Sequence, residues 1–324
     1  AIVIWLSLEY KSAEVLAYAG IAAMLPQALI GLIAGVYVDR LNRKYVMIFS
    51  DAFIAVCALV LLVILQNENV NLIWIYVLLG LRSIGNAFHT PALQAIAPLI
   101  VPQSELIKVA GINQVLHSVC SIGGPAIGTL AIAYLPISMV LYLDLIGALL
   151  AILSLVMVKI PDLVTKSKSS IHSITTDFLE GFQTISKNKG LRYLFLYAMA
   201  ITFIMMPAAI MFPLLTTGHY AGGKWEMGVI EVVWGGGMLI GGAILSTFKL
   251  KGSKVVAVNV MYVLLGLTFI LSGALPASWF VGFVLTTAIG GISLSVFNGC
   301  FTAIVQTEVS PDKLGRVFSL YYSL

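Results

Sequence analysis

Long apolar stretches alternate with short polar connections along almost the whole chain. A membrane-spanning helix needs about 20 consecutive apolar residues, and uninterrupted runs of that length favour helices over a membrane β-barrel, which reads as short alternating segments. The pattern predicts nine full spans and two partial ones, at about 1–6 and from about 316. The full spans are expected at residues 14–38, 45–66, 71–93, 108–134, 137–158, 191–216, 226–248, 255–273 and 277–305.

Composition agrees with this pattern. Apolar residues make up 60% of the 324 residues and charged residues only 10%, whereas soluble domains average about 45–50% and about 25%. We therefore predict an all-α membrane protein, and we expect both ends of the sequence to lie within helices of a longer protein. The net charge of +4 suits basic connections at a membrane surface better than a nucleic-acid-binding surface. The three cysteines and four histidines lack the spacing of a metal site, so no metal or other cofactor is predicted.

Basic residues orient the predicted bundle. Of the 18 lysines and arginines, only Lys11, Arg82 and Lys224 lie outside one set of alternate connections. Positively charged connections stay on the cytoplasmic side of a membrane. This set of connections is therefore predicted to face the cell interior.

One connection is much longer than the others and divides the spans into two groups. It predicts an N-terminal helical half at 1–158, a cytoplasmic linker at 159–190 and a C-terminal helical half at 191–324, and paired halves are common among secondary transporters. Apolar side chains recur within the linker at intervals of three and four residues, which predicts an amphipathic helix on the inner leaflet or against the end of the bundle. They are Ile171, Ile174, Phe178, Phe182 and Ile185.

The connection GVYVDRLNRK, from Gly35 to Lys44, concentrates four charges between two apolar runs. Asp39 is able to cap the positive N-terminus of a helix from the other half, while Arg40, Arg43 and Lys44 bind carboxylates or anionic lipid head groups. Such contacts would hold the cytoplasmic side closed. The alternative is that the basic residues only anchor the connection at the membrane surface.

Three charged residues stand out inside predicted spans, where an ionisable group costs about 2.5–3.5 kcal/mol on insertion scales and normally faces a partner or a wet cavity. Arg82 lies near the middle of its span, and Asp144 and Glu231 lie nearer the outer ends of theirs. They are candidates for proton coupling or for lining a substrate cavity. The alternative is that they fix helix packing through neighbouring polar groups.

Several of these segments resemble a known family. GVYVDRLNRK is similar to the signature G-x-x-x-D-R-x-G-R-R/K between the second and third helices of the major facilitator superfamily, with Asn42 in place of a glycine. Asn tolerates a left-handed turn, so we expect the connection to keep its shape. The stretches LPQALIGLIAGVYVDRLNRK, RSIGNAFHTP and PDKLGRVFSL look like the bacterial drug-exporter branch that includes macrolide-efflux proteins.

This resemblance implies a bundle of two six-helix halves in the bacterial cytoplasmic membrane, with the first helix truncated and most of the eleventh and the twelfth helix missing from this sequence. It also implies that the residues of the signature and of the late stretch control opening and closing rather than bind substrate. These residues are Gly35, Asp39, Arg40, Arg43, Lys44, Gly315 and Arg316.

The fifth predicted span resembles the superfamily's antiporter motif in part, with Cys120 in place of its second glycine and Thr129 in place of its last. The matching residues are Gly111, Gly124, Pro125 and Gly128. The motif implies export rather than uptake. The alternative is ordinary close helix packing, which small residues and a proline bend permit.

Taken with the resemblance, the residues predict a secondary active efflux transporter for macrolide-like or other amphipathic drugs, driven by proton antiport with alternating access. No clustered acidic or histidine motif indicates an enzyme. The expected partners are an amphipathic small molecule, protons and membrane lipids, with an ATP-binding partner protein left open. The alternatives are an exporter of a siderophore or lipid-like metabolite and a membrane receptor without transport.

Overall fold

The computed structural model describes residues 2–10, 12–66, 70–161, 171–248 and 252–323. Within these ranges, the side chains at 3–4, 7–8, 13, 125–126, 129–130, 132–133, 171–178, 204–211, 213 and 224 lie outside the description. The described chain is helical throughout and contains no strand, so the prediction of an all-α protein is confirmed. Seven of the described helices are long and apolar enough to cross a membrane.

A helix occupies each of the nine predicted spans and each of the two partial ones. The helices are α1 (Ile2–Tyr10), α2 (Ala13–Arg40), α3 (Arg43–Ile64), α4 (Leu72–Ile100), α5 (Leu106–Tyr134), α6 (Ile137–Met157), α7 (Ile171–Lys187), α8 (Lys189–Leu214), α9 (Lys224–Thr247), α10 (Lys254–Ala274), α11 (Phe280–Glu308) and α12 (Leu314–Ser323). Short turns of helix lie at Gln103–Glu105, Leu215–His219 and Pro311–Lys313.

Two polar caps determine where α2 and α3 begin. The Ser12 side chain accepts a hydrogen bond from the Val15 N–H at 3.4 Å, and the Asn42 side chain accepts one from the Lys44 N–H at 3.0 Å. Each satisfies a backbone donor that a helix leaves unpaired at its N-terminus. Asn42 has φ −64°, so the expected left-handed turn is wrong. The asparagine at position 42 instead acts as the N-cap of α3.

Contacts within the chain divide it into two units. The first contains Ala1–Ile100, Pro125–Asn188 and Val309–Leu324, and the second contains Val101–Gly124 and Lys189–Glu308. α5 therefore contributes to both units, and α12 is grouped with the first although it follows α11 in the chain. The division of the protein at the linker into 1–158 and 191–324 stays a prediction.

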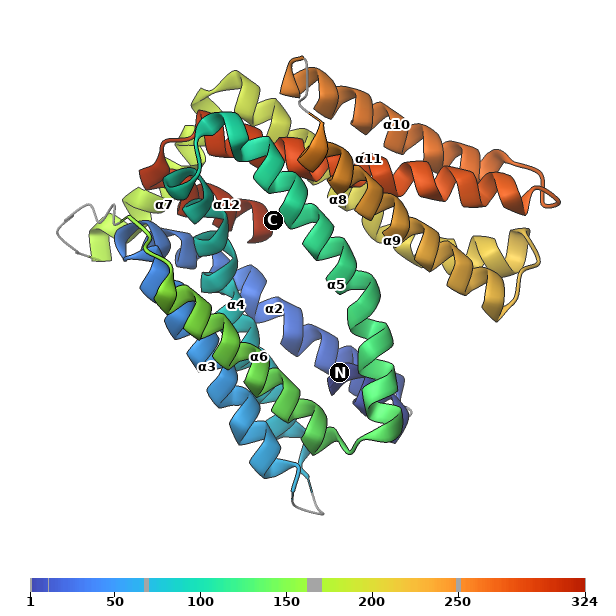
Figure 1. The fold of residues 1–324 in the computed structure, drawn as a ribbon, viewed down its shortest axis with the longest axis horizontal. Coiled ribbons are helices and arrows are strands. Elements are labelled where there is room, and N and C mark those ends of the chain that lie inside the picture. Colours follow the sequence, from blue (N-terminus) through green and yellow to red (C-terminus); the bar gives the residue numbers. More distant parts are fainter. Residues whose placement is uncertain (1, 11, 67–69, 162–170, 249–251, 324) are drawn as a thin grey trace. The chain divides into compact units, whose positions relative to one another are not determined.

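Each unit has its own packing. In the first, α4 packs against α2 and α3, α6 packs against α3, and α12 packs against α2. In the second, α11 lies between α9 and α10, and these three helices run side by side (Figure 1). Many large apolar side chains point outward, including Phe49 and Met157 at 71% and 83% exposure. Exposed apolar surface on this scale is typical of helices that face lipid.

Candidate functional site

Asp39 occupies a buried position in the last turn of α2 and uses both of its carboxylate oxygens. Oδ1 accepts a hydrogen bond from the Gly315 N–H at 2.7 Å, and Oδ2 accepts one from the Arg316 N–H at 2.9 Å. These N–H groups begin α12, and the partial positive charge of a helix N-terminus favours a carboxylate there. This is the capping contact expected of Asp39 from the sequence.

Two arginines surround the same carboxylate. The Arg43 guanidinium donates to Asp39 Oδ1 at 3.1 Å, to the Ala95 carbonyl at 2.8 Å and to the Pro311 carbonyl. Arg316 Nε lies 3.3 Å from Asp39 Oδ2. The negative charge of Asp39 is therefore shared between two helix N–H groups and two arginines, and these contacts join α2, α3 and α12.

A fourth residue, Glu180 on the linker helix α7, extends this arrangement. Arg316 Nη1 donates to Glu180 Oε2 at 3.0 Å. We refer to Asp39, Arg43, Glu180 and Arg316 as the Asp39 cluster. Sequence reasoning missed Glu180, because only the approach of α7 to α12 brings it near an arginine 136 residues away.

Glycines let α2 and α12 approach closely beside the Asp39 cluster. The Gly35 N–H donates to Ser319 Oγ at 3.2 Å. A Cβ atom on Gly35 would lie 2.5 Å from the Gly315 carbonyl oxygen and 2.8 Å from Arg316 Cα, both shorter than any normal contact. The glycine of the signature is therefore required by the backbone of the neighbouring helix.

Lys44, another basic residue of the signature, contacts the end of a further helix of the first unit. Lys44 Nζ donates to the carbonyl oxygens of Val156 at 2.9 Å and Val158 at 2.8 Å, at the C-terminal end of α6. A cation is favourable at the negative end of a helix, so Lys44 caps α6, a contact that was not expected from the sequence. Arg40 is half-buried at the last residue of α2.

Two of the three intramembrane charges predicted from the sequence meet. Arg82 Nη1 on α4 lies 2.7 Å from Asp144 Oδ2 on α6, and the two side chains are 20% and 44% exposed. Glu231 lies on α9 in the second unit, where it is exposed. Among the described residues Glu231 makes no ion pair.

A second intramembrane pair was missed from the sequence. His89 Nε2 on α4 lies 3.4 Å from Asp51 Oδ1 on α3, and both side chains are largely buried. The signal available was Asp51 itself, a carboxylate well inside the predicted span at 45–66. His89 was considered only as a metal ligand, and the described residues contain no group of three or more metal-binding side chains.

The partial antiporter motif separates into two parts. A Cβ atom on Gly111 would lie 2.5 Å from the Ser246 backbone nitrogen, so the start of α5 packs directly against the backbone of α9. A Cβ atom on Gly124 or Gly128 would meet nothing within 4 Å. The side chain of Pro125 lies outside the described residues. Close packing thus accounts for Gly111 and not for the two later glycines.

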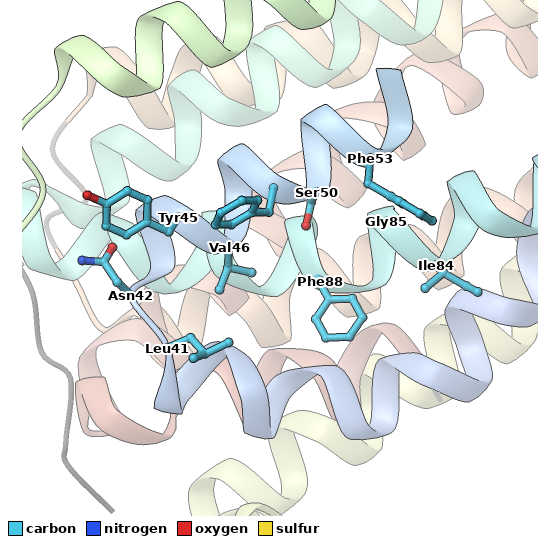
Figure 2. Close-up of a pocket in the computed structure, with 10 residues that line it drawn as sticks. Leu41, Asn42, Tyr45, Val46, Ser50, Phe53, Ile84, Gly85 and Phe88 are labelled. Atoms are coloured by element: carbon cyan, nitrogen blue, oxygen red, sulfur yellow. The ribbon is translucent and has the colours of Figure 1, made fainter. Parts of the chain in front are cut away.

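An apolar groove of about 540 Å³ lies where α3 and α4 meet the end of α2. Figure 2 shows aromatic rings from α3 and α4 along this groove, with polar atoms only at Asn42, Tyr45 and Ser50 among the labelled side chains. We call it the aromatic groove. Its lining residues are Leu41, Asn42, Tyr45, Val46, Phe49, Ser50, Phe53, Ile84, Gly85 and Phe88.

Comparison with known proteins identifies the family. The model of the Major Facilitator Superfamily matches residues 1–324, the whole chain. The chain belongs to the major facilitator superfamily. It is therefore a multi-pass membrane protein of a transporter family that handles small molecules, and the resemblance of the signature at Gly35–Lys44 is confirmed.

Relatives within the superfamily support this assignment. The chain is 35% identical to macrolide efflux protein A of Streptococcus pyogenes over 324 residues, which is all of this chain and 80% of the relative. It is 35% identical to macrolide efflux protein A of Enterococcus faecalis over 300 residues, covering 93% of each. The human organic anion transporter MFSD10 has the same fold, with a TM-score of 0.77 at 18% identity, covering 99% of this chain and 79% of that one.

Proposed function

We propose that this transporter exports macrolide-like or other amphipathic drugs across the bacterial cytoplasmic membrane by proton antiport. Two helical halves, 1–158 and 191–324, would open alternately to the two sides of the membrane, with 159–190 as the linker between them. The substrate class is supported by the name and the 35% identity of the two macrolide efflux proteins. Membership in a transporter superfamily supports a protein without enzymatic activity or a cofactor.

The Asp39 cluster is the observation that supports alternating access most directly. α12 follows α11 in the chain after only the residues 309–313, and α11 belongs to the second unit. The N-terminus of α12 is held by Asp39 at the end of α2, in the first unit. We infer that α12 leaves the end of α2 during the transport cycle, and this movement would break the Asp39 contacts. We propose that the Asp39 cluster is a lock that opens once in each transport cycle.

Buried charge supports coupling to protons. In the Arg82–Asp144 pair the guanidinium keeps its proton at any physiological pH, so the pair changes charge only when Asp144 takes up a proton. Protonation of Asp144 would leave the positive charge of Arg82 unbalanced and favour a different arrangement of α4 and α6. Glu231 offers a second carboxylate, exposed on α9, for a proton or for a cationic group of the substrate.

The substrate also needs apolar surface. The aromatic groove provides rings from α3 and α4 and few polar atoms, which suits the apolar body of an amphipathic molecule. Outside the groove, exposed apolar side chains provide the surface that membrane lipids cover. We assign no role to an ATP-binding partner protein, because the proposed proton gradient supplies the driving force.

Transport by the purified protein tests this function. Proteoliposomes with an acidic lumen are expected to accumulate a radiolabelled macrolide faster than protein-free liposomes, without added nucleotide, and an uncoupler is expected to remove the difference. Accumulation only when a nucleotide and a second protein are supplied would contradict the proposal. Saturable binding without any flux would indicate a receptor, and transport of a siderophore or a lipid-like molecule but no macrolide would indicate the alternative substrate class.

A further inference from the structure

The span α4 carries two basic side chains on one face. Arg82 and His89 are seven residues apart, which is two helical turns or about 10 Å. Each meets an aspartate from a different neighbouring helix, Arg82 with Asp144 on α6 and His89 with Asp51 on α3. Two acid–base pairs therefore lie one above the other along α4.

The two pairs differ in how they respond to pH. A guanidinium does not lose its proton in proteins, whereas an imidazole ordinarily changes charge between about pH 5 and 8. With the imidazole protonated, the Asp51–His89 pair has no net charge. When the imidazole gives its proton to water, the carboxylate of Asp51 remains as an uncompensated negative charge, although its side chain is only 16% exposed.

We propose that the Asp51–His89 pair is a proton-binding site of the transport cycle, which holds one proton in one state and releases it in the other. This inference rests on the proposed function and adds a site to it. In the release step the imidazolium loses one proton to water and the pair changes from neutral to one negative charge. Rebinding a proton from water on the other side restores the neutral pair.

Several other charged groups on the helices around this pair bind partners of their own. Lys44 on α3 binds the end of α6, Arg43 and Arg316 bind Asp39, and Arg82 binds Asp144. The remaining ionisable groups on α2, α3, α12 and the short turn before α12 are Glu14, Arg40, Cys57, Asp312, Lys313, Tyr321 and Tyr322, together with the tyrosines of α2, α3 and α4. Asp51 is the group that the structure places against the imidazole.

Local packing connects the charge of this pair to the contact between its helices. A Cβ atom on Gly85 would lie 2.6 Å from Ile54 Cγ1, so α3 and α4 approach closely one turn before His89. Pro91 follows within α4 and has no N–H to donate, which weakens that helix beside the pair. A change in the charge of the pair would therefore alter the forces between α3 and α4 at the place where they pack closely and where α4 bends most easily.

The pH profile of macrolide counterflow tests this inference, because counterflow exchanges labelled for unlabelled substrate without any gradient. The wild-type rate is expected to change with pH when it is measured between pH 5 and 8. His89→Gln keeps hydrogen-bonding capacity but cannot carry the charge, so its profile is expected to vary less than about twofold over that range. His117→Gln, on an exposed histidine of α5, is the matched control and is expected to keep the wild-type profile.

Asp51→Asn supplies a second variant if His89→Gln does not fold. Without the carboxylate the imidazolium loses its stabilising partner, so the pH profile is expected to differ from that of the wild-type protein. A flat wild-type profile, or wild-type profiles in His89→Gln and Asp51→Asn, would overturn the inference. The proposed function is tested by a different experiment. It would be contradicted if the wild-type protein showed no flux driven by a pH gradient, and that result does not depend on the counterflow profile.

Discussion

Replacing Asp39 by Asn is the sharpest perturbation of the Asp39 cluster. The side chain keeps its shape and one oxygen, but its second oxygen becomes an NH2 group. Whichever oxygen is replaced, that group would face both a helix N–H and an arginine side chain, which are donors as well. At least one donor at the start of α12 therefore loses its acceptor, and both arginines lose their buried counter-charge.

The expected effect is large because the carboxylate is buried. Removing one partner of a buried ion pair typically costs about 3–5 kcal/mol. These contacts exist when α12 is held against α2 and are lost when α12 is released. Since about 1.4 kcal/mol corresponds to a factor of ten, the variant shifts the equilibrium between the two states towards release by roughly a hundredfold to a few thousandfold. A closed state populated almost completely in the wild-type protein would then become a minor one.

Distances between spin labels on α2 and α12 measure this shift. The three native cysteines are first replaced, and cysteines are introduced for labelling at Leu41 and Ser310, which are both exposed. The distance between these labels reports on the separation of the two helix ends. The parent protein is expected to give one short distance and Asp39→Asn a second, longer population. Glu14→Gln, an exposed acidic residue at the other end of α2, is the control and should leave the distribution unchanged. An unchanged distribution in folded Asp39→Asn protein would refute the reasoning.

Three further variants test other parts of the account. Gly35→Ala places a Cβ atom 2.5 Å from the Gly315 carbonyl oxygen, so it should lengthen the same spin-label distance without any change in charge. In the control Gly20→Ala the new Cβ atom would meet nothing within 4 Å, so this distance should stay the same. Glu180→Gln removes the half-exposed partner of Arg316. Because exposed ion pairs contribute about 0–1 kcal/mol, we expect at most a fewfold change in counterflow rate. A loss as large as that of Asp39→Asn would contradict the smaller contribution assigned to Glu180. Arg82→Gln leaves Asp144 without its partner and should lower the melting temperature, while adding Asp144→Asn should restore stability but not flux driven by a pH gradient. Full gradient-driven flux in the double variant would exclude this pair from coupling.

Features that depend on local sequence were predictable. The nine spans follow from hydropathy alone, because a helix in lipid must be apolar over about 20 residues wherever it packs. The capping contact of Asp39 was also predictable from local sequence. A carboxylate at the end of one helix is able to cap the positive N-terminus of another helix. Which helix Asp39 would cap was not predicted, and the contacts with Gly315 and Arg316 identify it as α12.

Partners brought together by packing could not be predicted. Nothing near Glu180 indicates that its carboxylate meets Arg316, and nothing near Lys44 indicates the carbonyl oxygens at the end of α6. Each depends on how whole helices approach one another. Asp51 and His89 were visible as ionisable residues inside spans, but their significance lies in their being 3.4 Å apart across α3 and α4.

Simultaneous recording of proton and macrolide movement in proteoliposomes tests the central claim most directly. With a pH-sensitive dye in the lumen and no initial gradient, adding macrolide outside should move protons out of the lumen as the drug enters, and Asp39→Asn should slow both movements together. Macrolide entry that exceeds protein-free liposomes while the luminal pH stays constant would contradict proton antiport.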